Sequence, residues 1–144
     1  MSSTQTSLTQ KGDVQVNLRP ALQHVSIPRP PESDVETRRF YGDILGLEEM
    51  TPPRSLASLD VIWYRLGTAE LHLPVEEPSG QDHSGHHFCI AVDDVELLRQ
   101  QHEDAGIAVV GSTAIPGRPR YFIRDPFGNL IEITTIEHDY LEKE

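Results

Sequence analysis

Cysteine, basic residues and long apolar stretches are all scarce in this chain of 144 residues. The single cysteine, Cys89, excludes any disulfide within the chain, which fits a reducing compartment. Only 12 Lys and Arg stand against 23 Asp and Glu, and the net charge of −11 argues against nucleic-acid and membrane partners. Residues 1–19 hold no continuous apolar stretch that could serve as a signal peptide or a membrane span. We therefore expect a cytoplasmic protein with a flexible N-terminal tail over residues 1–19.

The pattern of apolar and turn-forming residues predicts a strand, a helix and three strands in the first half. The strand over 22–27 ends at a proline-rich segment, and Ser33 and Glu36 have the spacing of a capping box that begins a helix. Gly46 follows the apolar face of this helix, where a left-handed residue ends many helices. Three further strands are predicted over 47–50, 59–66 and 69–75.

The same order of elements returns in the second half. A strand over 87–92 precedes a helix that Asp93 or Asp94 caps and that Gly106 ends. Strands are again predicted over 107–110, 121–124 and 130–136. The turn formers of residues 125–129 separate the last two strands.

Four metal-competent side chains occupy equivalent positions in the two halves. Gly46 and Gly106 lie 60 positions apart, and the same offset relates His72 to Glu132. His24 and His87 each lie in the first strand of their half. Because side chains alternate along a strand, these four lie opposite the bulky apolar residues and can face a common cavity.

Three imidazoles and one carboxylate suit a divalent ion such as Zn²⁺, Ni²⁺, Co²⁺, Fe²⁺ or Mn²⁺. The counting favours His72 as a ligand, and Glu70 lies on the same face two residues earlier. Glu70 therefore stays open as a competing ligand or as a base. Cys89 also lies on this face, and we interpret it as a packing residue because nothing nearby marks it as a nucleophile.

Several segments together resemble the vicinal oxygen chelate superfamily, which includes glyoxalase I, extradiol dioxygenases and bleomycin-binding proteins. They are the segments around His24, the end of the first helix, residues 70–73, residues 87–93, and Asp125-Pro126-Phe127-Gly128-Asn129-Leu130-Ile131-Glu132. The resemblance covers residues 20–136 and implies an α+β fold. In that fold two βαβββ modules, residues 20–77 and 86–136, form an open, curved mixed β-sheet barrel as one domain. Residues 137–144 would then be an acidic C-terminal tail.

The resemblance also implies a function and a site. It places divalent-metal ligands at His24, His72, His87 and Glu132, and it indicates a lyase or isomerase of glyoxalase type that chelates a small substrate through vicinal oxygens. We expect Glu132 or Glu70 to move a proton.

Two other functions remain open: a ring-cleaving extradiol dioxygenase and a non-catalytic protein that binds a small molecule, as bleomycin-resistance proteins do. His72 stands where the dioxygenases have no ligand, and glyoxalase I usually has a glutamate there. Arg65, Arg120 and Tyr121 are the residues that we expect to orient the substrate. Related single-chain members often complete the cavity across a two-fold axis, so a homodimer is expected.

Overall fold

The computed structural model describes residues 19–77 and 84–138. Most of the predicted tails over residues 1–19 and 137–144 therefore lies outside the described residues, as does His83. Among the described residues, no helix combines the length and the apolar character that crossing a membrane requires.

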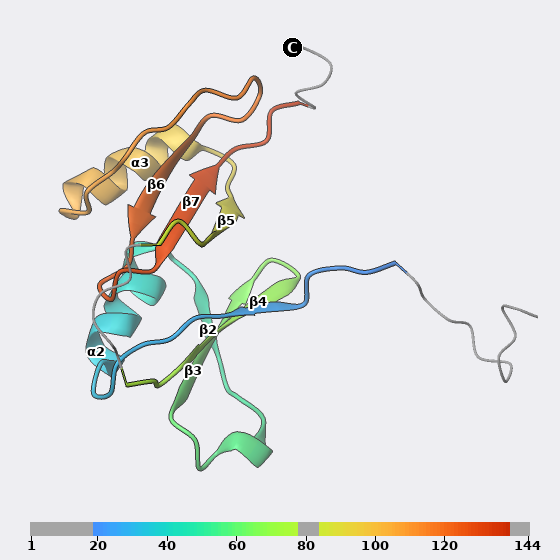
Figure 1. Cartoon of the computed structure of the whole chain (residues 1–144), viewed down its shortest axis with the longest axis vertical. Coiled ribbons are helices and arrows are strands. Elements are labelled where there is room, and N and C mark those ends of the chain that lie inside the picture. The colour runs from blue at the N-terminus through green and yellow to red at the C-terminus, as the bar shows by residue number, and fades with distance from the viewer. Residues whose placement is uncertain (1–18, 78–83, 139–144) are drawn as a thin grey trace, which may run out of the picture.

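The first module contains a four-stranded sheet in the order β1-β4-β3-β2. β1 runs parallel to β4, and the remaining pairs are antiparallel. The helix α2 continues as a π-helical segment, η2, and lies where the two sheets meet (Figure 1). The bounds are β1 (His24–Ser26), α2 (Asp34–Thr37), η2 (Arg38–Ile44), β2 (Glu48–Met50), η3 (Arg54–Leu56), β3 (Val61–Leu66) and β4 (Ala69–Pro74).

The second module contains a three-stranded sheet in the order β5-β7-β6, again with a parallel first pair and an antiparallel second pair. Its elements are β5 (His87–Ala91), α3 (Val95–Asp104), β6 (Arg120–Arg124) and β7 (Leu130–Thr134). The strand predicted over 107–110 is reduced to a single bridge between Val110 and Phe122. The structure thus confirms the α+β fold with mixed, open sheets.

The two helices begin in different ways. Asp94 accepts a hydrogen bond from the Leu97 amide and caps α3, as predicted. The capping box at Ser33 is wrong: the hydroxyl donates to the Pro30 carbonyl instead, and it accepts from the guanidinium of Arg29. Arg29 is fully buried, and this buried donor occupies the hydroxyl that the helix amides would otherwise use.

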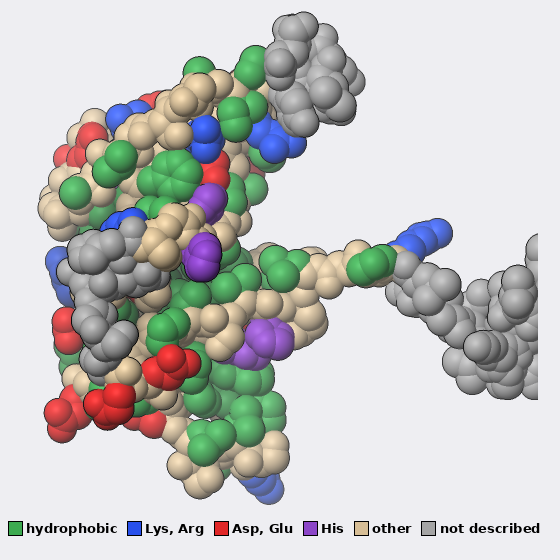
Figure 2. Space-filling view, viewed as in Figure 1, with side chains coloured by type: hydrophobic (Ala, Val, Ile, Leu, Met, Phe, Trp, Pro, Cys, Tyr) green, Lys and Arg blue, Asp and Glu red, His purple; other side chains and the backbone are tan. Residues whose placement is uncertain are grey.

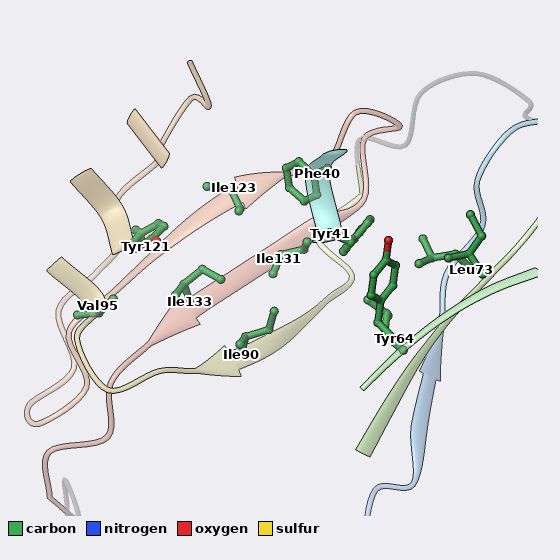
Figure 3. Close-up of a cluster of buried hydrophobic side chains, with 12 residues drawn as sticks. Phe40, Tyr41, Tyr64, Leu73, Ile90, Val95, Tyr121, Ile123, Ile131 and Ile133 are labelled. Atoms are coloured by element: carbon green, nitrogen blue, oxygen red, sulfur yellow. The ribbon is translucent and has the colours of Figure 1, made fainter. Parts of the chain in front are cut away.

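The hydrophobic core connects both modules. Leu71, Leu73, Ile131 and Ile133 are each 0% exposed, which confirms the predicted apolar faces of β4 and β7. Figure 3 shows Tyr41, from η2, between Ile131 of the second sheet and Tyr64 of the first. Since one helix contributes to the packing of both sheets, the two modules share a core.

A buried carboxylate at the turn before β7 joins the modules. Asp125 accepts hydrogen bonds from the Tyr41 hydroxyl at 2.5 Å and from the Asn129 side-chain amide at 2.8 Å. Its other oxygen accepts from the backbone amides of Phe127 and Asn129. Asn129 in turn donates to the Pro28 carbonyl of the first module. Burial raises the pKa of Asp125, and these donors lower it.

We predict that Tyr41→Phe lowers the free energy of unfolding by about 1 to 3 kcal/mol at neutral pH, because a buried carboxylate loses a donor. The variant should raise the pKa of Asp125 further, since the lost hydrogen bond lowers it. The destabilisation should therefore be largest above the folded-state pKa of Asp125 and should shrink as the pH falls through it. Urea unfolding at a series of pH values measures this effect.

Tyr64→Phe is the matched control. Tyr64 is also buried, but its hydroxyl has no hydrogen-bond partner in the described part of the chain. Its removal should change the free energy of unfolding by less than about 0.5 kcal/mol or stabilise the protein. Equal losses in the two variants would contradict a special role for the contact between Tyr41 and Asp125.

Candidate metal centre

The strand registers place the predicted ligands at equivalent positions of the two sheets. In the first sheet, His72 on β4 lies opposite Ser26, two residues after His24. In the second sheet, Glu132 on β7 lies opposite Cys89, two residues after His87. The structure therefore confirms the equivalence that was inferred from the 60-residue offset.

In the second module, His87 and Glu132 form a close pair. His87 Nε2 lies 3.1 Å from Glu132 Oε1, and Arg120 Nη1 donates to Glu132 Oε2 at 3.2 Å. Arg120 is itself held by Ser112 and by the Thr113 carbonyl. The carboxylate of Glu132 thus has one oxygen facing an imidazole and the other neutralised by a guanidinium.

In the first module, His72 lies in a stack of three rings. Its ring is parallel to the indole of Trp63, with centroids 3.7 Å apart, and it stacks on the ring of His24 at 4.2 Å. His72 Nε2 lies 2.9 Å from Glu70 Oε1, and this hydrogen bond is the largest cause that lowers the pKa of Glu70. Glu70 and His72, the two alternative ligands of the first module, therefore lie within hydrogen-bond distance of each other, and the choice between them stays open.

The two pairs stay separate within one chain. Figure 2 shows histidine side chains in two separate groups. Among the described residues, no three His, Cys, Asp or Glu side chains gather closely enough to hold a metal ion. Within the described residues, the predicted ligands therefore form two pairs, one on each sheet. Whether the two pairs combine within one chain or across two chains is left open by the sequence, and their common site stays a prediction.

The chemistry of the second-module pair fits a divalent ion. Imidazole and carboxylate ligands lie about 2.0 to 2.2 Å from Zn²⁺, which puts two neighbouring ligand atoms roughly 3.0 to 3.5 Å apart. His87 Nε2 and Glu132 Oε1 lie at the hydrogen-bond distance of 3.1 Å, which is also compatible with both atoms binding one ion. Close to this pair, partial burial and then the charge of Glu132 raise the pKa of the Cys89 thiol to about 11. Cys89 is exposed, so its interpretation as a packing residue is wrong: its side chain lies on the open face of β5 and not in the core.

The residues expected to orient a substrate divide between two faces. Arg120 lies against Glu132, and Arg65 lies opposite Glu70 across the antiparallel pair β3–β4. Tyr121 does not face the site as expected: it is 1% exposed, and its hydroxyl lies 2.9 Å from His102 Nδ1. Since Arg120 and Tyr121 are consecutive on β6, alternation allows only one of them on the site face.

Sequence reasoning missed two aromatic neighbours of the ligands. Trp63 covers His72, and Phe122 meets the ring of His87 edge-on with centroids 5.1 Å apart. Both lie directly across a strand pair from a site residue, Trp63 opposite His72 and Phe122 opposite Glu132. A predicted hairpin register would have identified them.

Comparisons with known proteins agree with this geometry. A family model described as Glyoxalase/Bleomycin resistance protein/Dioxygenase superfamily matches residues 24–133. No curated protein matches the chain.

Among solved structures, a glyoxalase family protein from Bacillus anthracis is 30% identical with a TM-score of 0.77, over 84% of this chain and 98% of that one. Two others share the fold. A lactoylglutathione lyase from Agrobacterium tumefaciens is 22% identical with a TM-score of 0.63, over 89% of this chain and 100% of that one. A glyoxalase/dioxygenase from Nostoc punctiforme is 21% identical with a TM-score of 0.67, over 88% of this chain and 100% of that one. The chain therefore belongs to the Glyoxalase/Bleomycin resistance protein/Dioxygenase superfamily, which is the vicinal oxygen chelate superfamily that its motifs resemble.

Proposed function

We propose that this protein is a divalent-metal-dependent enzyme of glyoxalase type, a lyase or isomerase, that acts on a small substrate chelated through vicinal oxygens. The observation that carries the proposal is the pair of His87 and Glu132, whose facing atoms are 3.1 Å apart. His24 and His72 repeat the pair at the equivalent positions of the first sheet. These four residues would hold the ion.

A bound ion would act as a Lewis acid that polarises the substrate oxygens. The identity of the ion stays open among Zn, Ni, Co, Fe and Mn, because a nitrogen and oxygen donor set does not choose among them. The protein supplies the proton transfer, for which Glu70 and Glu132 are the candidate bases. Arg120 holds the Glu132 carboxylate, and His72 holds that of Glu70, so each base has a partner that orients it. Arg120 and Arg65 are the cations that would orient the substrate.

We further propose a homodimer in which the pair from one chain completes the pair from the other. Support comes from the separation of the two pairs, since the described residues of one chain leave each of them as half of a four-ligand set.

Metal binding is the first test. We expect His87→Ala and Glu132→Ala to weaken divalent-metal binding by more than about a hundredfold, since the loss of groups that merely orient ligands already costs 10- to 100-fold. His86→Ala is the matched control, because His86 is exposed and precedes the strand. Metal content of the purified protein and calorimetric titration provide the measurement.

Absence of stoichiometric metal, with no effect of these substitutions, would instead support a non-catalytic small-molecule-binding protein. Oxygen uptake with a catechol in the Fe²⁺-loaded protein would support an extradiol dioxygenase.

The shared site predicts complementation between chains. His24→Ala and Glu132→Ala each damage every site in their own homodimer. When the two variants are mixed, a site shared across the dimer leaves one intact site in each mixed dimer, and a site within one chain leaves none. We therefore expect tight metal binding to return to about half of the sites in mixed dimers. No recovery in a confirmed mixed dimer would place the site within one chain.

Trp63 reports which residue of the first module binds the ion. It is the only tryptophan, and its indole lies 3.7 Å from the ring of His72. Ligation by His72 places a cationic centre beside the indole, so metal addition should change the tryptophan emission, and His72→Ala should abolish the change without abolishing folding. Saturating metal binding without any emission change would assign the ligand to Glu70.

A further inference from the structure

A cavity of about 570 Å³ lies beside the metal-binding face of the second module. Its volume is within the range of roughly 300 to 1,000 Å³ that small-molecule sites occupy. The walls include Phe122, Leu130 and Val110, and the rim includes Arg39 and Arg124. Apolar walls with a few charged groups are typical of a pocket that binds an organic ligand and fixes its orientation.

Two wall residues connect this cavity to the proposed metal ligands. The ring of Phe122 contacts that of His87 edge-on, and Leu130 lies directly opposite His87 across the pair β5–β7. His87 itself does not line the cavity, but the two wall residues place the cavity next to it. The apolar body of a ligand would lie along Phe122 and Leu130.

The charge at the rim favours an anion. Arg39 makes no hydrogen bond or ion pair among residues 19–77 and 84–138, although the whole chain carries a net charge of −11. Its neighbour Arg38 is different, because its Nε and Nη2 each donate to a carboxylate oxygen of Glu49 at 3.0 Å. An exposed guanidinium without a carboxylate partner at the rim of an apolar cavity is suited to bind a carboxylate of the ligand.

The carboxylate of Asp125, which also lines the cavity, does not cancel this charge. It is 4% exposed, and both of its oxygens accept hydrogen bonds from protein donors. Arg124 is held in place by the carbonyls of Gly128 and Ser84. The charged group that faces solvent at the rim is thus a guanidinium and not a carboxylate.

We propose that the substrate of this site is an apolar carboxylate, whose chain or ring lies along Phe122 and whose carboxylate binds Arg39. This inference rests on the proposed function, which places the candidate metal ligand Glu132 on the same face of β7 as the wall residue Leu130. It adds the chemical class of the substrate and a residue, Arg39, that determines specificity.

Binding of phenylbutyrate and of the uncharged phenylbutyramide to the full chain, measured by calorimetry at neutral pH after metal removal by chelation, tests the proposal. The carboxylate should bind about tenfold more tightly than the amide, which is the effect of one charge-assisted hydrogen bond. Arg39→Gln should remove this preference and leave the amide affinity unchanged. Arg38→Gln, the matched control on the next residue, should keep the preference.

A second pair of variants tests the location. Val110 is 60% exposed at the cavity wall, and Val35 is 82% exposed on α2 and does not line it. Val110→Glu should lower the affinity for phenylbutyrate more than the affinity for phenylbutyramide, and Val35→Glu should change neither affinity. Equal affinities of the two probes in the unmodified protein, or equal effects of Arg38→Gln and Arg39→Gln, would overturn the proposal.

Metal titration of the same samples separates the two proposals. Stoichiometric metal binding without preference for the carboxylate would reject the substrate class and leave the metal site intact. A preference for the carboxylate without any metal binding would contradict the proposed metalloenzyme and support the binding pocket alone.

Discussion

The fold depends on a buried carboxylate, Asp125, that receives donors from both modules. Tyr41 reaches it from the helix of the first module, and the amides of the turn before β7 bind it from the second. Asn129 extends the network to the Pro28 carbonyl. Burial of a charge is costly unless its oxygens are satisfied, so the network is stable only when the two modules are correctly joined. It therefore sets the orientation of the two sheets on which the ligand pairs lie.

The candidate ligands form one pair in each sheet. A histidine on the first strand and a second ligand on the last strand lie close together because these strands are parallel neighbours in each sheet. Each pair of candidate ligands depends only on the register of one sheet, so it forms when that sheet forms. Joining the two pairs into one site, as proposed above, requires the faces of two sheets to meet.

The sequence predicts what depends on periodicity and on local turns. The 60-residue offset between His72 and Glu132 reflects the repeated strand register, and the cap at Asp94 depends on residues a turn away. Features decided by distant residues were not predictable in the same way. The capping box at Ser33 fails because the buried Arg29 takes its hydroxyl, and Tyr121 was misplaced although the alternation from Arg120 already excluded it. The sequence does not tell which of the neighbouring arginines Arg38 and Arg39 binds Glu49. The structure gives this partner to Arg38 and, in the described part of the chain, none to Arg39.

Charge in this protein acts at two distances. The net charge of −11 repels anions over the whole surface, but at physiological salt this field is screened within about 8 to 10 Å. At shorter range two arginines near the second module differ. Arg120 forms an ion pair with Glu132, whereas Arg39 has no carboxylate partner within residues 19–77 and 84–138. An anionic ligand is therefore attracted only once it enters the cavity beside Phe122, where apolar contact contributes as well. Selectivity for an apolar carboxylate follows from this combination, because a polar anion lacks the contact and a neutral apolar molecule lacks the ion pair.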